Sequence, residues 1–512
     1  MQKNLEKKEL DKSLKFIFES SIFVFIAIIF SKLLTYAYRI IIARYFGPEV
    51  YGLFSLAIMI LSFLVAFSSL GLVEGVLRFT SYYQGKNEIH KIRYIFKLSA
   101  SILLTSSILF AILLFSFSKI ISINLFHEPE LILFLRIFSF LIPVYLFLYL
   151  FSIIIQAFEK IKVQSFILDF LENFLKLIFL ITLIFLGLKT NAVIFSYSLG
   201  VIIAGLVAFI YCRYKISDIF KKYELDSKSK IEIKTKLLSY SWPLVFYSIL
   251  FGILPYIDSF TIGYFKGAFD VGLYNAAVPL ATLMVLFPQL FMRLFFPLVT
   301  KEYSRKNLSV INELSKQIEK WIIIVNLPVF LMMVIFPGAI INIFFGPDYI
   351  LAENSLRFLA IGFLFYSTSI ISHNLISMIG KTRLILMNIL FASILNLILN
   401  IILVPRFGIN GAAISTAITY IILTLVFFFQ VKIYVSIVPI RRKLFRVTLS
   451  AIIPTIILIY IKQFIPINLL TIIVLGGFFT LLYMLMIFLT KSLDDNDLMI
   501  LKSINNKMKF QR

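Results

Sequence analysis

Charged side chains occur inside several of the long apolar runs of this sequence. Lys32 and Arg39 stand seven residues apart in one run, so a helix would place both on the same face. A charged group is costly in hydrocarbon and usually faces a protein interior or a wet cavity. Two bases on one face suit the binding of an anionic head group such as a phosphate. We therefore take Lys32 and Arg39 as the first candidates for a binding site.

Other charged residues give weaker candidates. Three more arginines near the ends of apolar runs are candidates for anion binding: Arg44, Arg78 and Arg293. Each has an alternative interpretation as an interfacial anchor whose long side chain reaches the lipid headgroups. Asp258 has no opposite charge within one helical turn, so it is the leading candidate for coupling to a cation or for pairing with a base of the first run. Two further acidic candidates are Glu74 and Asp169.

One pair of opposite charges has a structural interpretation. Glu172 and Lys176 stand four residues apart, a spacing at which helical side chains meet. A pair that neutralises itself crosses an apolar region at lower cost than a single charge. We therefore predict a structural role for this pair.

Residue combinations typical of enzymes are absent from the sequence. It contains three histidines and one cysteine, so no intrachain disulfide can form and no His/Cys cluster has metal spacing. Neither a GxSxG nucleophile motif nor a Walker-type phosphate loop is present. The sequence thus predicts a protein that is not an enzyme and that needs no cofactor and no metal.

The composition predicts an all-α polytopic membrane protein. Hydrophobic residues make up 60% of the 512 residues, charged residues make up 15%, and the mean hydropathy is +0.98. Apolar runs of about 20 residues, the length that crosses a bilayer as a helix, continue from residue 16 to residue 489. We count about fourteen spans: 17–42, 50–74, 94–118, 131–155, 165–186, 193–213, 241–263, 273–298, 321–344, 355–378, 384–404, 411–431, 447–462 and 468–489.

The distribution of the net charge of +23 predicts the orientation in the membrane. Lys and Arg are spread over short loops rather than gathered in a basic domain, which argues against nucleic acid as a partner. Alternate loops, together with both tails, carry about three quarters of the Lys and Arg residues. By the positive-inside rule both termini are cytoplasmic. The loops on the other side are all short, which leaves no room there for a catalytic domain.

An internal repeat predicts two six-helix lobes. Residues 47–57, GPEVYGLFSLA, match residues 267–277, GAFDVGLYNAA, and further matches follow at an offset of about 220. Because each unit has an even number of spans, both lobes insert the same way and are related by a pseudo-two-fold axis along the membrane normal. The predicted organisation is a tail 1–15, an N-lobe 16–214, a linker 215–240, a C-lobe 241–432, an accessory helix pair 433–490 and a tail 491–512.

Several motifs resemble those of one transporter family. The motifs are residues 43–52 (ARYFGPEVYG), Ile257-Asp258 with Gly263, residues 271–274 (VGLY), and Asn396, Asn400 and residues 404–413 (VPRFGINGAA). Together they are similar to the polysaccharide-biosynthesis flippases of the multidrug/oligosaccharidyl-lipid/polysaccharide exporter superfamily. The first run, with Ser31-Lys32 and Ala43-Arg44, is also similar to that of lipid II flippases, in which a basic residue at the position of Lys32 faces the central cavity. Those proteins have an Arg-Asp pair where this chain has Tyr38-Arg39, which argues against lipid II as the substrate.

The resemblance implies alternating-access translocation of a lipid-linked oligosaccharide, carried on a polyprenyl phosphate or pyrophosphate, across the cytoplasmic membrane. Expected partners are this substrate, membrane lipids and H⁺ or Na⁺ as a coupling ion, with the chain working as a monomer. Two alternatives stay open. One is a multidrug cation exporter of the same superfamily, and the other is a membrane polysaccharide polymerase or glycosyltransferase.

Overall fold

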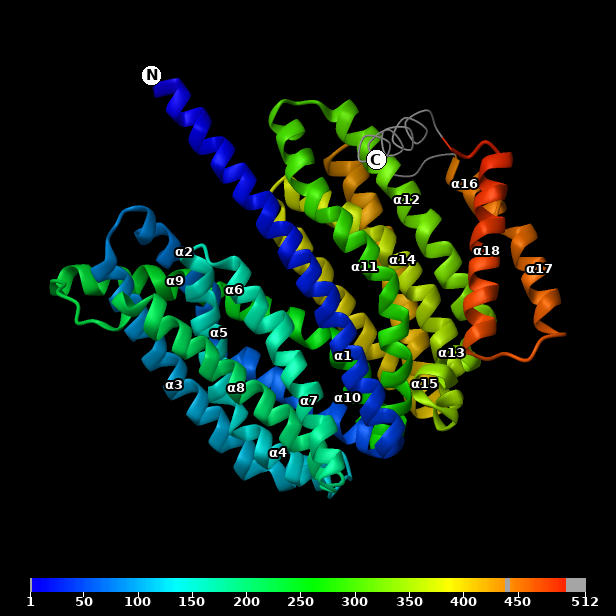
Figure 1. Cartoon of the computed structure of the whole chain (residues 1–512), viewed down its shortest axis with the longest axis horizontal. Helices are drawn as coiled ribbons and strands as arrows, with labels where there is room; N and C mark the ends of the chain where they lie inside the picture. Colours follow the sequence, from blue (N-terminus) through cyan, green and yellow to red (C-terminus); the bar gives the residue numbers. More distant parts are fainter. Residues whose placement is uncertain (1, 438–442, 494–512) are drawn as a thin grey trace. The chain divides into compact units, whose positions relative to one another are not determined.

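The computed structural model describes residues 2–437 and 443–493, which fold as helices joined by short turns, with no β-strand in these ranges (Figure 1). Each of the fourteen predicted spans is predominantly helical, so the predicted all-α class is confirmed. By length and apolar composition, nine helices in the described ranges can cross a membrane, or ten with the bent pair α4–α5. Two of the nine, α1 and α15, each contain a glycine with non-helical backbone angles and so consist of two helical segments.

The chain forms two compact units, residues 1–272 and 273–512. The elements of the first unit are α1 Gln2–Ser69, α2 Leu72–Gly85, α3 Ile89–Ile120, η1 Ile121–Leu125, α4 Leu131–Ser139, α5 Leu141–Ala157, α6 Ile161–Ser165, η2 Phe166–Leu171, α7 Glu172–Phe185, α8 Asn191–Lys215, η3 Ser217–Phe220, α9 Ser227–Ile253, η4 Leu254–Tyr256, α10 Ile257–Lys266 and the first turn of α11 Ala268–Ser304. The remainder of α11 belongs to the second unit, with α12 Leu308–Ile335, α13 Pro337–Phe345, η5 Pro347–Ala352, α14 Glu353–Met378, α15 Thr382–Tyr434, α16 Lys443–Leu449, α17 Ile452–Lys462 and α18 Leu469–Leu489.

Backbone angles agree at positions that the repeat makes equivalent. Gly47 breaks α1 with φ +82° and ψ 178°, and Gly267 separates α10 from α11 with φ +86° and ψ −177°. Glycine adopts this positive-φ region without a steric penalty, which explains why both turns carry it. The residues that precede α6 and α15, Lys160 and Lys381, also agree, with φ −92°, ψ 47° and φ −83°, ψ 53°. These matches support the duplication that the sequence predicts.

Gly52 of α1 and Gly272 of α11 form a close backbone contact. A Cβ at Gly52 would lie 1.7 Å from the carbonyl oxygen of Ala268, and a Cβ at Gly272 would lie 1.9 Å from that of Pro48. Pro48 and Ala268 are themselves repeat equivalents, so the contact is reciprocal, as expected where a two-fold axis passes. The N–H of Ala268 donates to Glu128 Oε1 at 2.6 Å, whereas Pro48 has no N–H that needs a partner.

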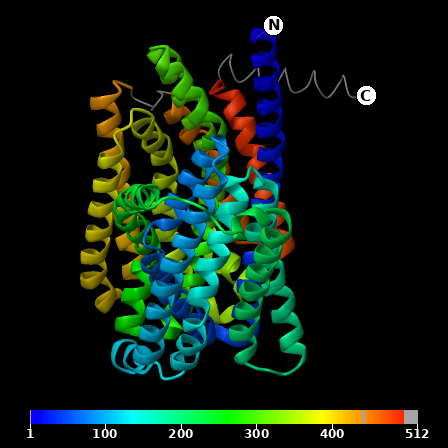
Figure 2. The same cartoon turned by 90° about the vertical axis from the view of Figure 1, so that its left-hand side faces the viewer.

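Helix α9 crosses the other helices of the first unit and is seen nearly end-on in Figure 2. It lies so close to α2 that a Cβ on Gly71 would meet the carbonyl oxygen of Ser241 at 2.4 Å, and a Cβ on Gly75 would meet the hydroxyl of Ser241 at 2.4 Å. The predicted span 241–263 is not one continuous helix in the structure. Helix α9 ends at Ile253, and α10 begins after the turn η4. Pro255 lacks the N–H that a continuous helix requires at this point.

The two units divide at a different place from the predicted lobes. Helices α9 and α10, placed by the sequence at the start of the C-lobe, contact α1 and α2 and belong to the compact first unit. The lobe boundaries at 214 and 241 describe the repeat rather than this packing, and they stay predictions. Residues 438–442 and 494–512, parts of the predicted accessory pair and tail, lie outside the described residues.

The chain after α8 folds back onto the start of α3. Arg93 donates to the carbonyl oxygens of Asp218 and Lys222 at 2.6 and 3.1 Å, and Ile219 is fully buried. The ammonium of Lys221 bonds the exposed carboxylate of Asp218 at 2.6 Å and lowers its pKa, with Arg93 adding a smaller effect. A depressed carboxyl pKa stabilises the fold at neutral pH, and this contribution is lost as the pH falls through the lowered value. Because the pair of Lys221 and Asp218 is exposed to solvent, its contribution to stability is small.

In the second unit, α14 packs against α15. The two halves of α15 are joined side by side by Asn388 and Gln430, whose amides exchange hydrogen bonds of 2.7 and 2.8 Å. Helices α17 and α18, within the predicted accessory pair, contact each other, and α18 packs on α12. Lys462 at the end of α17 donates to the carbonyl oxygen of Ile335 at 2.7 Å. This bond satisfies one of the carbonyls that the end of α12 leaves open.

Candidate functional site

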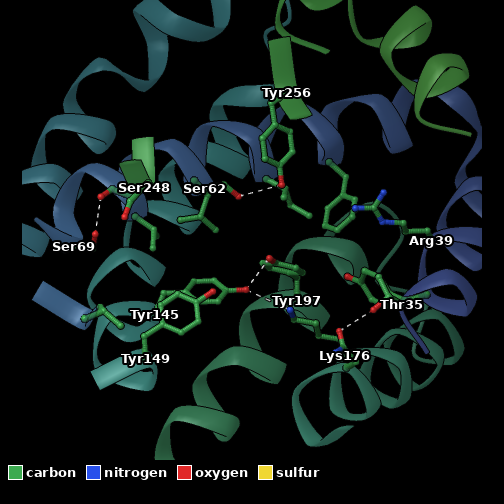
Figure 3. A pocket seen from close by; sticks show the side chains of 18 of the residues that line it. Thr35, Arg39, Ser62, Ser69, Tyr145, Tyr149, Lys176, Tyr197, Ser248 and Tyr256 are labelled. Carbon is green, nitrogen blue, oxygen red and sulfur yellow. Dashed lines mark hydrogen bonds between the residues drawn. The ribbon is translucent and has the colours of Figure 1, made fainter. Parts of the chain in front are cut away.

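The first unit contains a partly open cavity of about 540 Å³ (Figure 3). Residues of α1, α2, α5, α7, α8, α9 and η4 line it. In Figure 3, Ser69 and Ser248 lie at one side of the cavity, whereas Thr35, Arg39 and Lys176 lie at the other. This volume falls within the roughly 300–1,000 Å³ of pockets that hold small ligands.

Aromatic rings form much of the wall: Tyr38, Phe54, Tyr145, Tyr149, Tyr197 and Tyr256. Edge-to-face contacts fix their orientations, with Phe54 at 5.7 Å from Tyr38 and 5.5 Å from Tyr197 between ring centroids. The hydroxyl of Tyr256 lies 3.5 Å from that of Ser62 on α1. Tyrosine offers a flat apolar face and a polar tip, a combination that suits ligands carrying both kinds of surface.

Arg39 supplies a positive charge to the cavity. Its side chain is half-buried and hydrogen-bonds the hydroxyl of Tyr51, which is fully buried. A neutral phenol holds the guanidinium in place without cancelling its charge. Because guanidinium carries five N–H donors in a planar fork, Arg39 retains donors for a phosphate or carboxylate oxygen.

Lys176 lines the same cavity, and together with Glu172 it anchors a hydrogen-bond network. Lys176 Nζ lies 2.6 Å from Glu172 Oε1, 3.3 Å from the hydroxyl of Tyr145 and 4.0 Å from the ring centroid of Tyr197. The hydroxyls of Tyr145 and Tyr197 lie 2.7 Å apart, and that of Tyr145 lies 3.3 Å from Glu172 Oε1. The predicted pairing of Glu172 with Lys176 is thus present, and it positions two of the cavity tyrosines.

We expect Lys176→Met and Glu172→Gln each to destabilise the protein by about 3–5 kcal/mol, because each leaves one charged partner buried without the other. The double variant Lys176→Met/Glu172→Leu should lose much less, since both charges are removed together. Thermal unfolding of purified protein in detergent measures these differences. The exposed pair of Glu232 and Lys236 on α9, at 2.5 Å, is the matched control and should change stability by less than about 1 kcal/mol. Equal losses in the single and double variants would contradict the expectation.

A polar bridge joins α1 to α7 beside the cavity. Thr35 donates to Asn173 Oδ1 at 3.2 Å, and Asn173 Nδ2 donates to the hydroxyl of Ser31 at 3.1 Å. Lys32 is exposed next to this bridge. Its positive charge is attracted by the carboxylate of Asp169 and repelled by the guanidinium of Arg39. Neither Lys32 nor Asp169 lines the cavity.

Of the eight charged candidates from the sequence, Arg39 and Glu74 line the cavity. Arg44 and Arg78 are exposed outside it, with the guanidinium of Arg78 stacked 4.2 Å over the ring of Tyr240. Asp258 is buried in the first turn of α10, also outside the lining. Arg293 lies in α11, and its side chain is outside the described residues. The functional roles of all eight stay predictions.

The sequence reasoning missed the aromatic wall and the place of Lys176 in it. Tyr145 and Tyr149 stand one helical turn apart in an apolar run, a spacing that would have indicated a shared face. Tyrosines are also frequent at membrane interfaces, so the pattern alone does not distinguish an anchor from a cavity wall.

Comparison with known proteins gives two family matches. Residues 17–302 match the family described as polysaccharide biosynthesis protein, and residues 243–402 match the MatE family. Several curated relatives match over much of the chain. A putative O-antigen transporter of Shigella flexneri is 24% identical over 396 residues, which cover 74% of this chain and 89% of the relative. The probable low-salt glycan biosynthesis flippase Agl15 of Haloferax volcanii is 28% identical over 298 residues, 58% of this chain and 61% of the relative. The chain spans about half the length (49%) of an uncharacterised membrane protein of Methanocaldococcus jannaschii, which is 29% identical.

Solved structures share the fold. A structure of the lipid II flippase MurJ in an inward closed conformation aligns with a TM-score of 0.72 and 19% identity, over 90% of this chain and 98% of that one. An inward-facing multidrug transporter of the MATE family aligns with a TM-score of 0.63 and 15% identity, over 79% of this chain and 94% of that one. The family match covers more than half of the sequence, and these solved structures share the helical architecture. The chain therefore belongs to the polysaccharide biosynthesis protein family.

Proposed function

We propose that this protein is a flippase that translocates a lipid-linked oligosaccharide across a membrane by alternating access. The observation that carries the proposal is the cavity of the first unit, whose lining is rich in tyrosines and includes Arg39. Relatives that are described as an O-antigen transporter and a glycan biosynthesis flippase support it.

The chemistry of the wall matches the polar part of such a substrate. A sugar ring has apolar C–H faces and a rim of hydroxyls, which complement tyrosine faces and hydroxyls. A phosphate linked to it is an acceptor for the fork of Arg39. A cavity of about 540 Å³ has room for a ligand of moderate size but not for a long prenyl chain, which stays in the lipid in this proposal.

The second candidate is a multidrug cation exporter, favoured by the MatE match and by the acidic Glu74 in the cavity lining. A cation would have to approach Arg39 and Lys176 in the same lining, and like charges make this unfavourable. We also propose that the protein is a transporter without catalytic activity.

The function is tested with purified protein in vesicles that contain a fluorescent polyprenyl-diphosphate saccharide. Loss of fluorescence to a quencher that cannot cross the membrane reports the fraction of label on the outer leaflet. Vesicles with protein should reach complete quenching, whereas protein-free vesicles should stop at about half, since lipid-linked sugars do not cross unaided. Equal plateaus with and without protein would exclude flipping of this substrate. In a separate assay, protection of cells that produce the protein from cationic drugs would favour the exporter instead.

We further propose that the protein works as a monomer in the cytoplasmic membrane, with both termini in the cytoplasm and with ion-coupled transport. The distribution of Lys and Arg over alternate loops supports this orientation. Single cysteines at Lys86 and Lys189, introduced after Cys212→Ser, test it in intact cells. An impermeant thiol reagent should label the cysteine at position 189 and not that at 86. The reverse pattern would invert the topology.

A further inference from the structure

One turn of α12 in the second unit is enclosed by protein on every side. The consecutive residues Gln317, Ile318, Glu319 and Lys320 are 6%, 8%, 2% and 0% exposed. Successive residues of a helix project about 100° apart, so four buried residues in a row cover the whole circumference. Acidic and basic side chains at this level are therefore surrounded by protein rather than by lipid or water.

Glu319 lacks a partner in this enclosed turn. Its Oε2 is buried and has no hydrogen-bond partner, and no ion pair in the described residues includes it. On α12 itself, Glu313 lies 3.8 Å from Lys316, and the neighbouring Lys320 projects in a different direction from Glu319. Lys462 of the α17–α18 pair is engaged at the far end of α12, with the carbonyl of Ile335.

Elements packed against α12 carry few titratable or charged groups in the described residues. Helix α11 contacts α12 through Asn326 and Trp321, and its part in the second unit carries Tyr274, Lys301, Glu302 and Tyr303, with Glu302 paired to Arg305 at 3.2 Å. The other groups are Glu353, Arg357, Tyr366 and His373 on α14, Arg446 on α16 and Tyr483 on α18. Glu353 and Arg357 pair with each other at 3.6 Å, and the ring of Tyr366 stacks on that of Tyr420. His373 contacts the ring of Phe427, and the hydroxyl of Tyr483 has no hydrogen-bond partner. None of these groups forms an ion pair with Glu319.

A polar stripe connects Glu319 to the start of α12. Asn312, Ser315 and Glu319 follow at intervals of three and four residues and so share one helix face. Asn312 Oδ1 is buried and also lacks a partner, and the hydroxyl of Ser315 donates to the carbonyl of Ile311 at 2.7 Å, which leaves its lone pairs open. Two side chains that accept hydrogen bonds, Asn312 and Ser315, therefore lie between the start of the helix and the carboxyl group.

We infer that Glu319 is a proton-binding site, occupied by a proton in this conformation, and that the stripe of Asn312 and Ser315 is its route to water. An ionised carboxylate buried without a cation is strongly unfavourable, and protonation removes the charge. Bound Na⁺ is the alternative occupant of this site, and the gradient experiment below distinguishes it from H⁺. The use of this proton to drive transport rests on the proposed function, whereas its binding does not.

Infrared spectroscopy of the purified protein tests the binding directly. At neutral pH the wild type should show the carbonyl stretch of a protonated carboxylic acid, and Glu319→Gln should lose it. The control Glu232→Gln removes an exposed glutamate that is paired with Lys236, so it should leave the band unchanged. Glu319→Gln should unfold at the wild-type temperature, since glutamine replaces a neutral acid of the same shape. A band unaffected by Glu319→Gln would show that Glu319 is ionised and would overturn the proposal.

Vesicles with an imposed pH gradient test the coupling. The wild type should flip the fluorescent lipid-linked saccharide faster with the gradient than without it, whereas Glu319→Gln should flip at a rate independent of the gradient. A sodium gradient at equal pH should change neither rate. A variant that keeps the wild-type response to pH would overturn the coupling role, and a response to sodium instead would identify a Na⁺ site. If even the wild type flips no lipid, the proposed function fails, while the infrared result still decides whether Glu319 holds a proton.

Discussion

Arg39→Ala is expected to reduce translocation of the lipid-linked saccharide at least about tenfold in the vesicle assay. Arg39 is the cavity cation that is anchored by a neutral hydroxyl, that of Tyr51, whereas Lys176 is already paired with Glu172. A hydrogen bond to a charged group contributes about 1.5–3 kcal/mol, and each 1.4 kcal/mol corresponds to a factor of ten. One lost contact with a substrate phosphate therefore accounts for the expected effect, and two account for about a hundredfold.

Two further variants separate binding from folding. Arg39→Lys keeps the charge but loses the planar fork, so it should retain an intermediate rate. Arg44→Ala, five residues along α1 and outside the cavity lining, should flip at the wild-type rate. Thermal unfolding of all three variants excludes misfolded protein. Equal rates for Arg39→Ala and Arg44→Ala would show that the cavity charge has no part in transport.

Gly52→Ala is expected to destabilise the first unit by about 1–3 kcal/mol or more, and Gly272→Ala by a similar amount. Each added methyl group would lie within 2 Å of a backbone carbonyl oxygen on the opposite helix, so α1 and α11 would have to move apart. A backbone oxygen cannot turn aside as a flexible side chain can. The loss should appear as a lower unfolding temperature and as low yield from the membrane.

Gly477→Ala on α18 is the matched control for this steric argument. No atom lies within 4 Å of the position of its added Cβ. The same chemical change should leave stability unchanged or raise it by up to about 1 kcal/mol, because alanine is the better helix former. If Gly477→Ala and Gly52→Ala lowered the unfolding temperature equally, close packing of the backbones would not be the cause.

The elements could be predicted from the sequence because they depend on local properties. Run length and hydropathy located fourteen spans, each of which is predominantly helical in the structure. The repeated turn at Gly47 and Gly267 also followed from local chemistry, since both need a positive φ. Span 241–263 differs from its prediction as one continuous helix, because it is divided into α9 and α10 by the turn that contains Pro255. Helix α9 also crosses the other helices of the first unit. Its course is set by contact with Gly71 and Gly75, more than 160 positions earlier in the chain.

The site was less accessible to sequence reasoning than the fold. Charge inside an apolar run led to Arg39 and Glu74, because a charged residue in lipid is conspicuous in any sequence. It also led to Lys32, Arg44 and Asp258, which the fold places outside the cavity lining. Exposure to lipid, water or a cavity depends on which helices stand beside a residue, and no local pattern states this.

The sequence by itself thus determined the helical class, the approximate spans, the repeat and the turns, since hydrophobic burial and backbone sterics act within a few residues. The tertiary structure alone decided which polar groups share an enclosed space. It brought tyrosines of α1, α5, α8 and η4 into one cavity lining with Arg39, and it enclosed Glu319 of α12 without a partner. The physical reason is that the free energy of a charge depends on its surroundings, and in a helical bundle those surroundings come from segments far apart in the chain.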